Sequence, residues 1–199
     1  MKLVLASGNP GKLREIAALL APLAIHVIPQ GEFSIEDADE PHLTFLENAL
    51  AKARHASRAA HLPALADDSG LCVDALGGAP GVHSAYYGGH EGTREQRDAR
   101  NNEKLLKELG ERRAAYYCCV MALVRQPDDP RPLIAEGVWR GEIARAARGS
   151  NGFGYDPLFY LRDLRKTAAE LEPEHKNRIS HRGIALAKLI TLLNENRAD

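Results

Sequence analysis

Residues 3–12 read Leu3-Val-Leu-Ala-Ser-Gly-Asn-Pro-Gly-Lys12, and the order of residue types in this stretch decides the fold. The four residues at its start predict a short buried strand, and the glycines and proline that follow predict a tight turn. Asn9 is a favourable N-cap, and Pro10 suits the first position of a helix because a residue there needs no N–H donor. A strand, a glycine turn and a helix N-terminus in this order present backbone N–H groups to an anion.

Two capping boxes and one apolar stripe predict three further helices. Thr44-Phe-Leu-Glu47 and Thr93-Arg-Glu-Gln96 each place a hydroxyl at an N-cap and a partner side chain three residues later. We expect the first of these helices to reach about Ala60 and the second to end at Gly110. Apolar residues at helical spacing predict the third helix, which begins near Ser180 and occupies the C-terminal end of the chain.

Short apolar runs bounded by turn residues predict the strands. These runs are residues 3–6, 62–66, 115–124, 133–139 and 158–160. The turn sequence Gln126-Pro-Asp-Asp-Pro130 joins the third run to the fourth and predicts a hairpin. Strands that alternate with helices and then form a hairpin predict an α/β fold, with a mixed β-sheet and flanking helices.

Length and composition restrict the class of protein. The chain has 199 residues, of which 44% are hydrophobic and 27% charged, so we expect one globular domain over residues 1–199. With a formal net charge of -1 no overall field attracts nucleic acid or a membrane, and an anionic ligand must be held by local groups. Cys72, Cys118 and Cys119 form no CxxC motif, which suits buried thiols in a reducing cytoplasm. No apolar stretch approaches the roughly 20 residues of a membrane-spanning helix.

Lys12 and the pair Asp67-Asp68 are the first candidates for chemistry. Lys12 lies one turn into a helix whose N-terminal amides favour negative charge, so a phosphate there would meet both. The spacing is not that of a Walker A loop, because Leu13 follows the lysine. Asp67-Asp68-Ser69-Gly70 is expected at the end of a strand, where successive side chains point to opposite sides and only one carboxylate needs to face Mg²⁺. A solvated lysine and an Asx-turn are the alternative interpretations.

An acidic run and the helix after it add candidates for the same site. Most of the run Glu36-Asp-Ala-Asp-Glu40 is expected to be a solvated loop. Glu47 is explained as a member of its capping box. Asn48 and Lys52 are four residues apart on a helix and share a face, so both can contact one ligand. A solvent-exposed lysine is the alternative for Lys52.

Two later segments suit the recognition of a base. Glycines surround Phe153 in Gly149–Pro157, which favours a stacking platform, with a ring tucked into the core as the alternative. In Lys176–Gly183, the side chains of His181 and Arg182 fall in the first turn of the last helix, where cations oppose the helix dipole. This locally unfavourable placement indicates that the two side chains serve function rather than stability.

Six strings in this order match one enzyme family. They are Ser7-Gly-Asn-Pro-Gly-Lys12, Thr44-Phe-Leu-Glu-Asn-Ala49, Ala66-Asp-Asp-Ser-Gly-Leu71, Gly77-Gly-Ala-Pro-Gly81, Gly152-Phe-Gly-Tyr-Asp-Pro157 and Ile179-Ser-His-Arg-Gly183. With them the chain resembles, from Ser7 to Gly183, the inosine triphosphate pyrophosphatase family of Ham1-like enzymes. Where family members commonly carry Ser-Ala-Arg-Tyr, this chain has Ser84-Ala-Tyr-Tyr87, and no role is transferred to Tyr86.

The resemblance implies an elongated, two-lobed α/β protein that is a homodimer and binds its nucleotide in a cleft between the lobes. It implies Mg²⁺-dependent hydrolysis of ITP, dITP or XTP to the monophosphate and pyrophosphate, which removes these nucleotides from the pool. Asp68 would be the general base and a metal ligand, with Glu40 assisting at the metal. The residues implied to bind substrate are Ser7, Gly8, Asn9, Pro10, Gly11, Lys12, Lys52, Ser69, Phe153, Gly154, Tyr155, Asp156, Lys176, His181 and Arg182.

Other functions remain open at this stage. A phosphotransferase is disfavoured because the chain has neither a Walker A loop nor the signature of an acceptor site. A non-catalytic nucleotide-binding module would not need Asp68 beside a metal. A Maf-like nucleotide pyrophosphatase has similar architecture and different base specificity, and the Ser180-His-Arg182 segment favours the Ham1-like branch.

Overall fold

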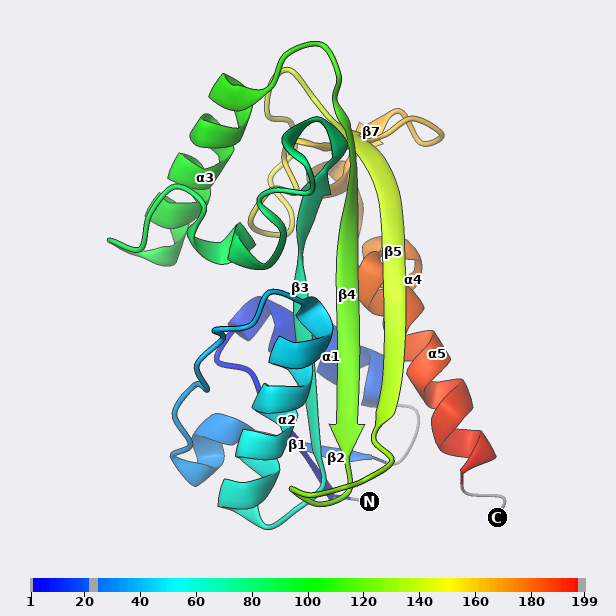
Figure 1. Ribbon diagram of the computed structural model, residues 1–199. Coiled ribbons are helices and arrows are strands. Elements are labelled where there is room, and N and C mark those ends of the chain that lie inside the picture. The colour runs from blue at the N-terminus through cyan, green and yellow to red at the C-terminus, as the bar shows by residue number, and fades with distance from the viewer. Residues whose placement is uncertain (1, 22–24, 197–199) are drawn as a thin grey trace. The chain divides into compact units, whose positions relative to one another are not determined.

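The computed structural model describes residues 2–21 and 25–196, and its strands form one seven-stranded sheet in the order β2-β1-β3-β4-β5-β6-β7 (Figure 1). The strands are β1 (Lys2–Leu5), β2 (His26–Pro29), β3 (Ala64–Val73), β4 (Ala114–Val124), β5 (Leu133–Ile143), β6 (Phe159–Leu161) and β7 (Lys166–Thr167). Strand β1 pairs with β2 and β3 in parallel, whereas β6 pairs with β5 and β7 in antiparallel fashion. The predicted α/β fold with a mixed sheet is confirmed.

Within the described residues, five α-helices accompany the sheet. They are α1 (Pro10–Leu20), α2 (Phe45–Ala60), α3 (Arg94–Glu108), α4 (Pro173–Ile179) and α5 (His181–Glu195). The predicted N-caps are confirmed at the start of α1, α2 and α3, where Asn9, Thr44 and Thr93 each accept a backbone N–H bond. The full capping box forms at α3, whereas at α2 the carboxylate of Glu47 accepts from the hydroxyl of Thr44. Helix α4 was not predicted, although Pro173 at its first turn is a recognised start signal.

The chain divides into two compact units, and each has its own hydrophobic core. The first unit contains Met1–Asp68, Cys119–Gly137 and His181–Asp199, and the second contains Ser69–Cys118 and Val138–Ser180. In the first unit, apolar side chains of β1, α1, β4 and α5 pack together. In the second, side chains of β4, β5, β6 and α3 surround the rings of Tyr117, Trp139 and Phe159.

The parallel pairing of β1 with β3 places the glycine turn before α1 beside the Asp67-Asp68 pair. Leu5 lies beside Leu65, and the N–H of Ala6 donates to the carbonyl of Leu65. Ser7 and Asp67 each come two residues after this pair, so the glycine turn that begins at Ser7 lies close to Asp67. The register of the sheet, rather than a local motif, brings these segments together.

Strand β3 is longer than predicted. The expectation that the strand ends before Asp67 is wrong, because β3 continues to Val73 and buries every residue except Ser69. Two carboxylates can lie inside a buried strand only where partners neutralise them, and both Asp67 and Asp68 have cationic partners. Gly70 also favours continuation, since any side chain there would clash with the carbonyl of Gly81.

Helix α5 begins against β5, at a glycine. A Cβ atom on Gly137 would clash with the carbonyl oxygen of His181 and the backbone nitrogen of Ala185. The missing side chain lets the first turn of α5, which carries His181 and Arg182, lie directly on the strand.

Cys72, Cys118 and Cys119 are buried and form no disulfide. In residues 2–21 and 25–196, no helix has the length and apolar character needed to span a membrane.

Candidate active site

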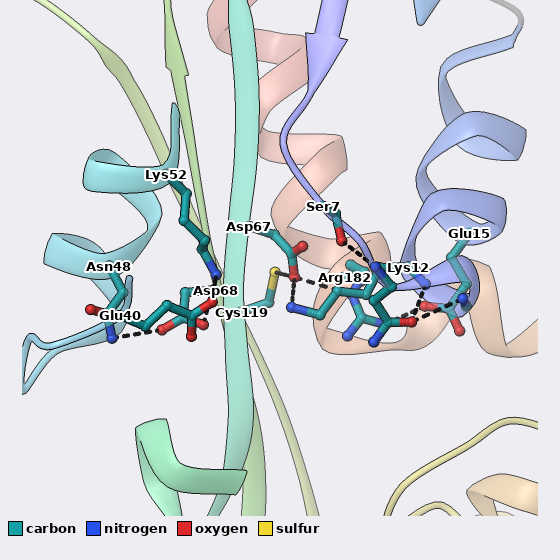
Figure 2. A network of polar contacts seen from close by, with 12 residues as sticks. Ser7, Lys12, Glu15, Glu40, Asn48, Lys52, Asp67, Asp68, Cys119 and Arg182 are labelled. Carbon is teal, nitrogen blue, oxygen red and sulfur yellow. Dashed lines mark hydrogen bonds and ion pairs between the residues drawn. The ribbon is translucent and has the colours of Figure 1, made fainter. Parts of the chain in front are cut away.

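Asp67 and Asp68 project to opposite faces of β3, as successive residues of a strand must (Figure 2). They are 1% and 4% exposed, so neither carboxylate is solvated. In Figure 2, residues of α1 and α5 meet Asp67 on one side of the strand, and residues of α2 meet Asp68 on the other. The strand thus separates two polar clusters of the first unit.

The Asp67 cluster is a network of buried ion pairs. The Nζ atom of Lys12 lies 3.0 Å from Oδ2 of Asp67, and Nε of Arg182 lies 3.5 Å from the same oxygen. The Nη1 atom of Arg182 also pairs with Glu15, one turn after Lys12 on α1. Burial would raise the pKa of Asp67, but the charges of Lys12 and Arg182 outweigh burial and hold the pKa well below its usual range.

The glycine turn before α1 has its hydrogen bonds organised around Asn9. The side-chain oxygen of Asn9 accepts from the N–H groups of Gly11 at 2.9 Å and Lys12 at 3.2 Å. The N–H of Asn9 donates to Oγ of Ser7. Gly8 leaves room for the acidic loop (residues 36–42), because a Cβ atom on Gly8 would clash with the carboxylate of Asp37. The turn holds a helix N-terminus and the ammonium of Lys12 on the Asp67 side of β3.

The Asp68 cluster joins both oxygens of one carboxylate to α2. Nζ of Lys52 donates to Oδ1 of Asp68 at 3.1 Å, and Nδ2 of Asn48 donates to Oδ2 at 3.2 Å. Burial raises the pKa of Asp68 above its ordinary value, against the opposing charge of Lys52. Burial lowers the pKa of Lys52, but attraction to Asp68 and the other nearby carboxylates outweighs burial and raises it.

Glu40 and Asp68 share the ammonium of Lys52 and are the candidates to hold a cation. Nζ of Lys52 lies 2.9 Å from Oε1 of Glu40 and 3.1 Å from Oδ1 of Asp68, so the two carboxylates converge. The part of the chain that the structure describes has no group of three His, Cys, Asp or Glu side chains placed to hold a metal. Two carboxylate oxygens fit Mg²⁺, which takes its remaining ligands from phosphates and water.

The segment around Phe153 forms a tight turn of the second unit. Gly152 and Gly154 have φ angles of 77° and 63°, which favour glycine. Oδ2 of Asp156 accepts from the N–H of Phe153 at 2.9 Å and from Nζ of Lys176 at 2.7 Å. Asp156 and Lys176 are buried, and this ion pair ties the turn to α4.

The ring of Phe153 is half-buried and lies among cations. Cζ of Arg94 is 4.6 Å from the ring centroid, and Nζ of Lys176 is 4.9 Å from it. From α3, Asp98 accepts the N–H of Gly154 and Asn102 donates to its carbonyl. Helix α3 therefore holds both backbone groups of Gly154, and the adjacent ring of Phe153 has positively charged partners.

The structure distributes the predicted site residues over both units. Ser7 to Lys12, Glu40, Lys52, Asp68, His181 and Arg182 lie in the first unit, and Ser69, Phe153 to Asp156 and Lys176 lie in the second. Within the second unit, Tyr155 is buried in the core and its hydroxyl donates to the carbonyl of Ser84. Tyr86, the departure from the family pattern, stacks on His90 at 4.4 Å and is 45% exposed.

Sequence reasoning missed several partners in these clusters. Glu15 is one turn after Lys12, a spacing that could have identified it as a neighbour. Asp98 and Asn102 carry no local signal, because their partner Gly154 is far away in the sequence. Asn48 shares a helix face with Lys52, but this spacing alone does not predict its bond to Asp68.

Comparison with known proteins gives one consistent family. Residues 3–192 match the model of the Ham1 family. The dITP/XTP pyrophosphatase of Burkholderia pseudomallei is 61% identical over 198 residues, covering 98% of this chain and 95% of that protein. The enzyme of the same name from Nitrosomonas europaea is 58% identical, covering 98% and 95%. A HAM1 protein structure from Coxiella burnetii superposes with a TM-score of 0.89 at 52% identity, covering 98% and 99%.

The buried ion pairs of Asp67 predict a large loss of stability in Asp67→Asn. Removal of one partner leaves Lys12 and Arg182 buried without their shared counter-charge, which costs about 3–5 kcal/mol. Urea unfolding followed by circular dichroism measures the loss. Asp129→Asn is the matched control, because Asp129 is also buried but its partner Arg125 is half-exposed. Equal losses in the two variants would contradict the interpretation.

Proposed function

The chain belongs to the Ham1 family, and from this premise we propose that it hydrolyses dITP, XTP and ITP to the nucleoside monophosphate and pyrophosphate. The family and the class of hydrolases acting on phosphoric anhydrides, both expected from the sequence, are confirmed by its relatives. The observation that carries the proposal is the pair of buried carboxylates on β3. Asp67 is neutralised by Lys12 and Arg182, while Asp68 converges with Glu40.

The proposed triphosphate site lies at the glycine turn and the start of α1. Helix N-termini favour anions, and a lysine one turn later adds a point charge that binds phosphate. The substrate-binding residues of this part are Ser7, Gly8, Asn9, Pro10, Gly11, Lys12 and Lys52. A phosphate at this place would compete with Asp67 for Lys12, whose Nζ atom lies 3.0 Å from Oδ2 of that carboxylate.

Glu40 and Asp68 are proposed to hold Mg²⁺. The ion, when bound, would neutralise phosphate charge and make a coordinated water more acidic. The convergence of two carboxylate oxygens on one ammonium supports this role, because such oxygens are the ligands that Mg²⁺ prefers.

Asp68 is proposed as the general base that takes the proton of the attacking water. Burial raises its pKa, which brings the carboxylate closer to the pKa that suits a base near neutral pH. Lys52 and Asn48 bind its two oxygens and fix its orientation. Water would attack in line with the departure of pyrophosphate.

The purine base of the nucleotide is proposed to stack on Phe153. Phe153 offers a half-buried aromatic face in a turn held by Asp156 and α3. Ser69, Gly154, Tyr155, Asp156, Lys176, His181 and Arg182 complete the proposed substrate-binding residues. The proposal further includes a homodimer, which the resemblance implies, no nucleic-acid partner, which the net charge implies, and a cytoplasmic location, which suits the three cysteines.

A product assay with an Asp68→Asn variant tests the proposed chemistry. The wild type is expected to convert dITP with Mg²⁺ to dIMP and pyrophosphate, and the variant to lower kcat by about 10²–10⁴ because a positioned base is lost. Chromatography of the nucleotides and a pyrophosphate assay give both products. Asp128→Asn, on a side chain 93% exposed, is the control. Orthophosphate as the product, or full turnover by Asp68→Asn, would refute the proposal.

Two glutamates give a matched test of the metal site. Glu40→Gln removes a carboxylate that converges with Asp68 and is expected to raise the Mg²⁺ concentration for half-maximal activity by about tenfold or more. Glu47 is exposed and its carboxylate accepts from the hydroxyl of Thr44 at 2.6 Å, so Glu47→Gln is expected to leave the Mg²⁺ dependence unchanged. Mg²⁺ titrations of initial rate compare them. The opposite order of effects would remove Glu40 from the metal site.

Arg182 is proposed to contribute to the choice of base, because a guanidinium donor can pair with the 6-oxo group of hypoxanthine or xanthine but not with the 6-amino group of adenine. Arg182→Lys keeps a positive charge near Asp67 and Glu15 but loses the planar set of donors, so discrimination of dITP against dATP is expected to fall at least about tenfold. The kcat/KM ratio for the two nucleotides measures it. Arg125→Lys, in the hairpin of the first unit, controls for the loss of a guanidinium. An unchanged ratio would show that Arg182 serves the fold alone.

A further inference from the structure

Asn48 lies inside α2 and bonds both to Asp68, the proposed general base, and to His42 of the acidic loop. Its side chain is 0% exposed. Nδ2 donates to Oδ2 of Asp68 at 3.2 Å and to the carbonyl of His42 at 3.2 Å. Oδ1 accepts from the N–H of His42 at 3.0 Å. Both amide hydrogens and the amide oxygen are therefore used.

The chemistry of these three bonds requires an amide. His42 presents a donor and an acceptor through its backbone, and Asp68 presents an acceptor. An aspartate at position 48 would keep the acceptor for the N–H of His42 but lose both donors. An alanine would lose all three bonds and leave buried polar groups without partners, which is costly in the interior.

Asn48 and Lys52 together tie the acidic loop to β3 at two points. Lys52, one turn after Asn48, joins Oε1 of Glu40 to Oδ1 of Asp68. Asn48 joins the backbone of His42, two residues beyond Glu40, to the other oxygen of the same carboxylate. The loop position of Glu40 and the orientation of Asp68 thus depend on one helix face, visible in Figure 2.

We propose that Asn48 is a positioning residue for the hydrolysis: it orients Asp68 and sets the distance between Asp68 and Glu40 before metal and nucleotide bind. This inference rests on the proposed function, since it assumes that Asp68 and Glu40 are the working carboxylates. Residues that orient metal-binding carboxylates through hydrogen bonds usually change metal affinity or activity about 10–100-fold when replaced.

Two variants and one control separate positioning from general stabilisation. Asn48→Ala removes every bond, and Asn48→Asp keeps the acceptor for the N–H of His42 but replaces both donors with a carboxylate that faces Asp68. Asn101→Ala is the control, because Asn101 is 2% exposed and also bridges backbone groups, accepting from Gly88 and donating to the carbonyls of Ser84 and Ala85 in the second unit. All three changes disturb a buried amide, but only position 48 touches Asp68.

Three measurements are made on each protein. They are amide hydrogen exchange of His42 without ligands, the Kd for Mn²⁺ as the metal probe by electron paramagnetic resonance, and kcat with dITP. Asn48→Ala is expected to speed exchange at His42, weaken Mn²⁺ binding and lower kcat, each of the last two by about 10–100-fold. Asn48→Asp is expected to keep His42 protected while kcat falls at least about tenfold. Asn101→Ala is expected to lower Tm and change none of the three.

The outcomes that overturn the inference are distinct from failure of the proposed function. Mn²⁺ affinity and kcat within twofold of wild type in a folded Asn48→Ala would overturn it, as would equal losses in Asn101→Ala. If Asn48→Ala does not fold, Asn48→Asp decides, and undiminished turnover by that variant overturns the inference. If wild type does not hydrolyse dITP, the proposed function fails, while His42 exchange and Mn²⁺ affinity still decide the role of Asn48.

Discussion

Two adjacent carboxylates inside one buried strand are the constraint on which the first unit depends. Side chains alternate along β3, so Asp67 and Asp68 must leave it in opposite directions, and each needs a cation because an isolated buried charge is very costly. Lys12 and Arg182 meet one carboxylate and Lys52 meets the other. Helices α1 and α5 on one side of β3, and α2 on the other, bring these charges to the strand (Figure 2).

Local signals predicted the fold well wherever the cause was local. Asn9 and Pro10 predicted the start of α1, and Thr93 with Gln96 predicted α3, because a cap and its partner are neighbours in the sequence. The length of β3 could not be predicted in this way. Asp67 and Asp68 read as the end of a strand, since the partners that make their burial possible come from distant helices.

The same distinction applies to the site. The alternation of Asp67 and Asp68, and the shared face of Asn48 and Lys52, follow from strand and helix geometry and could be predicted. The contacts of Arg182 could not. Its place in the first turn of a helix indicated a functional contact, but not the ion pairs that the buried guanidinium makes with Glu15 and Asp67.

The balance of charge in the first unit gives a physical reason for a divalent cation in the proposed reaction. Four carboxylates, of Glu15, Glu40, Asp67 and Asp68, face three cationic side chains. Together the Asp67 and Asp68 clusters thus have no excess positive charge to offer a triphosphate, and the formal net charge of the chain, -1, adds none. Carboxylates without a counter-charge would strongly repel desolvated phosphates placed next to them. Mg²⁺ held by Glu40 and Asp68 would reverse the sign of that interaction, so the acidic side chains that oppose the nucleotide alone would favour its metal complex.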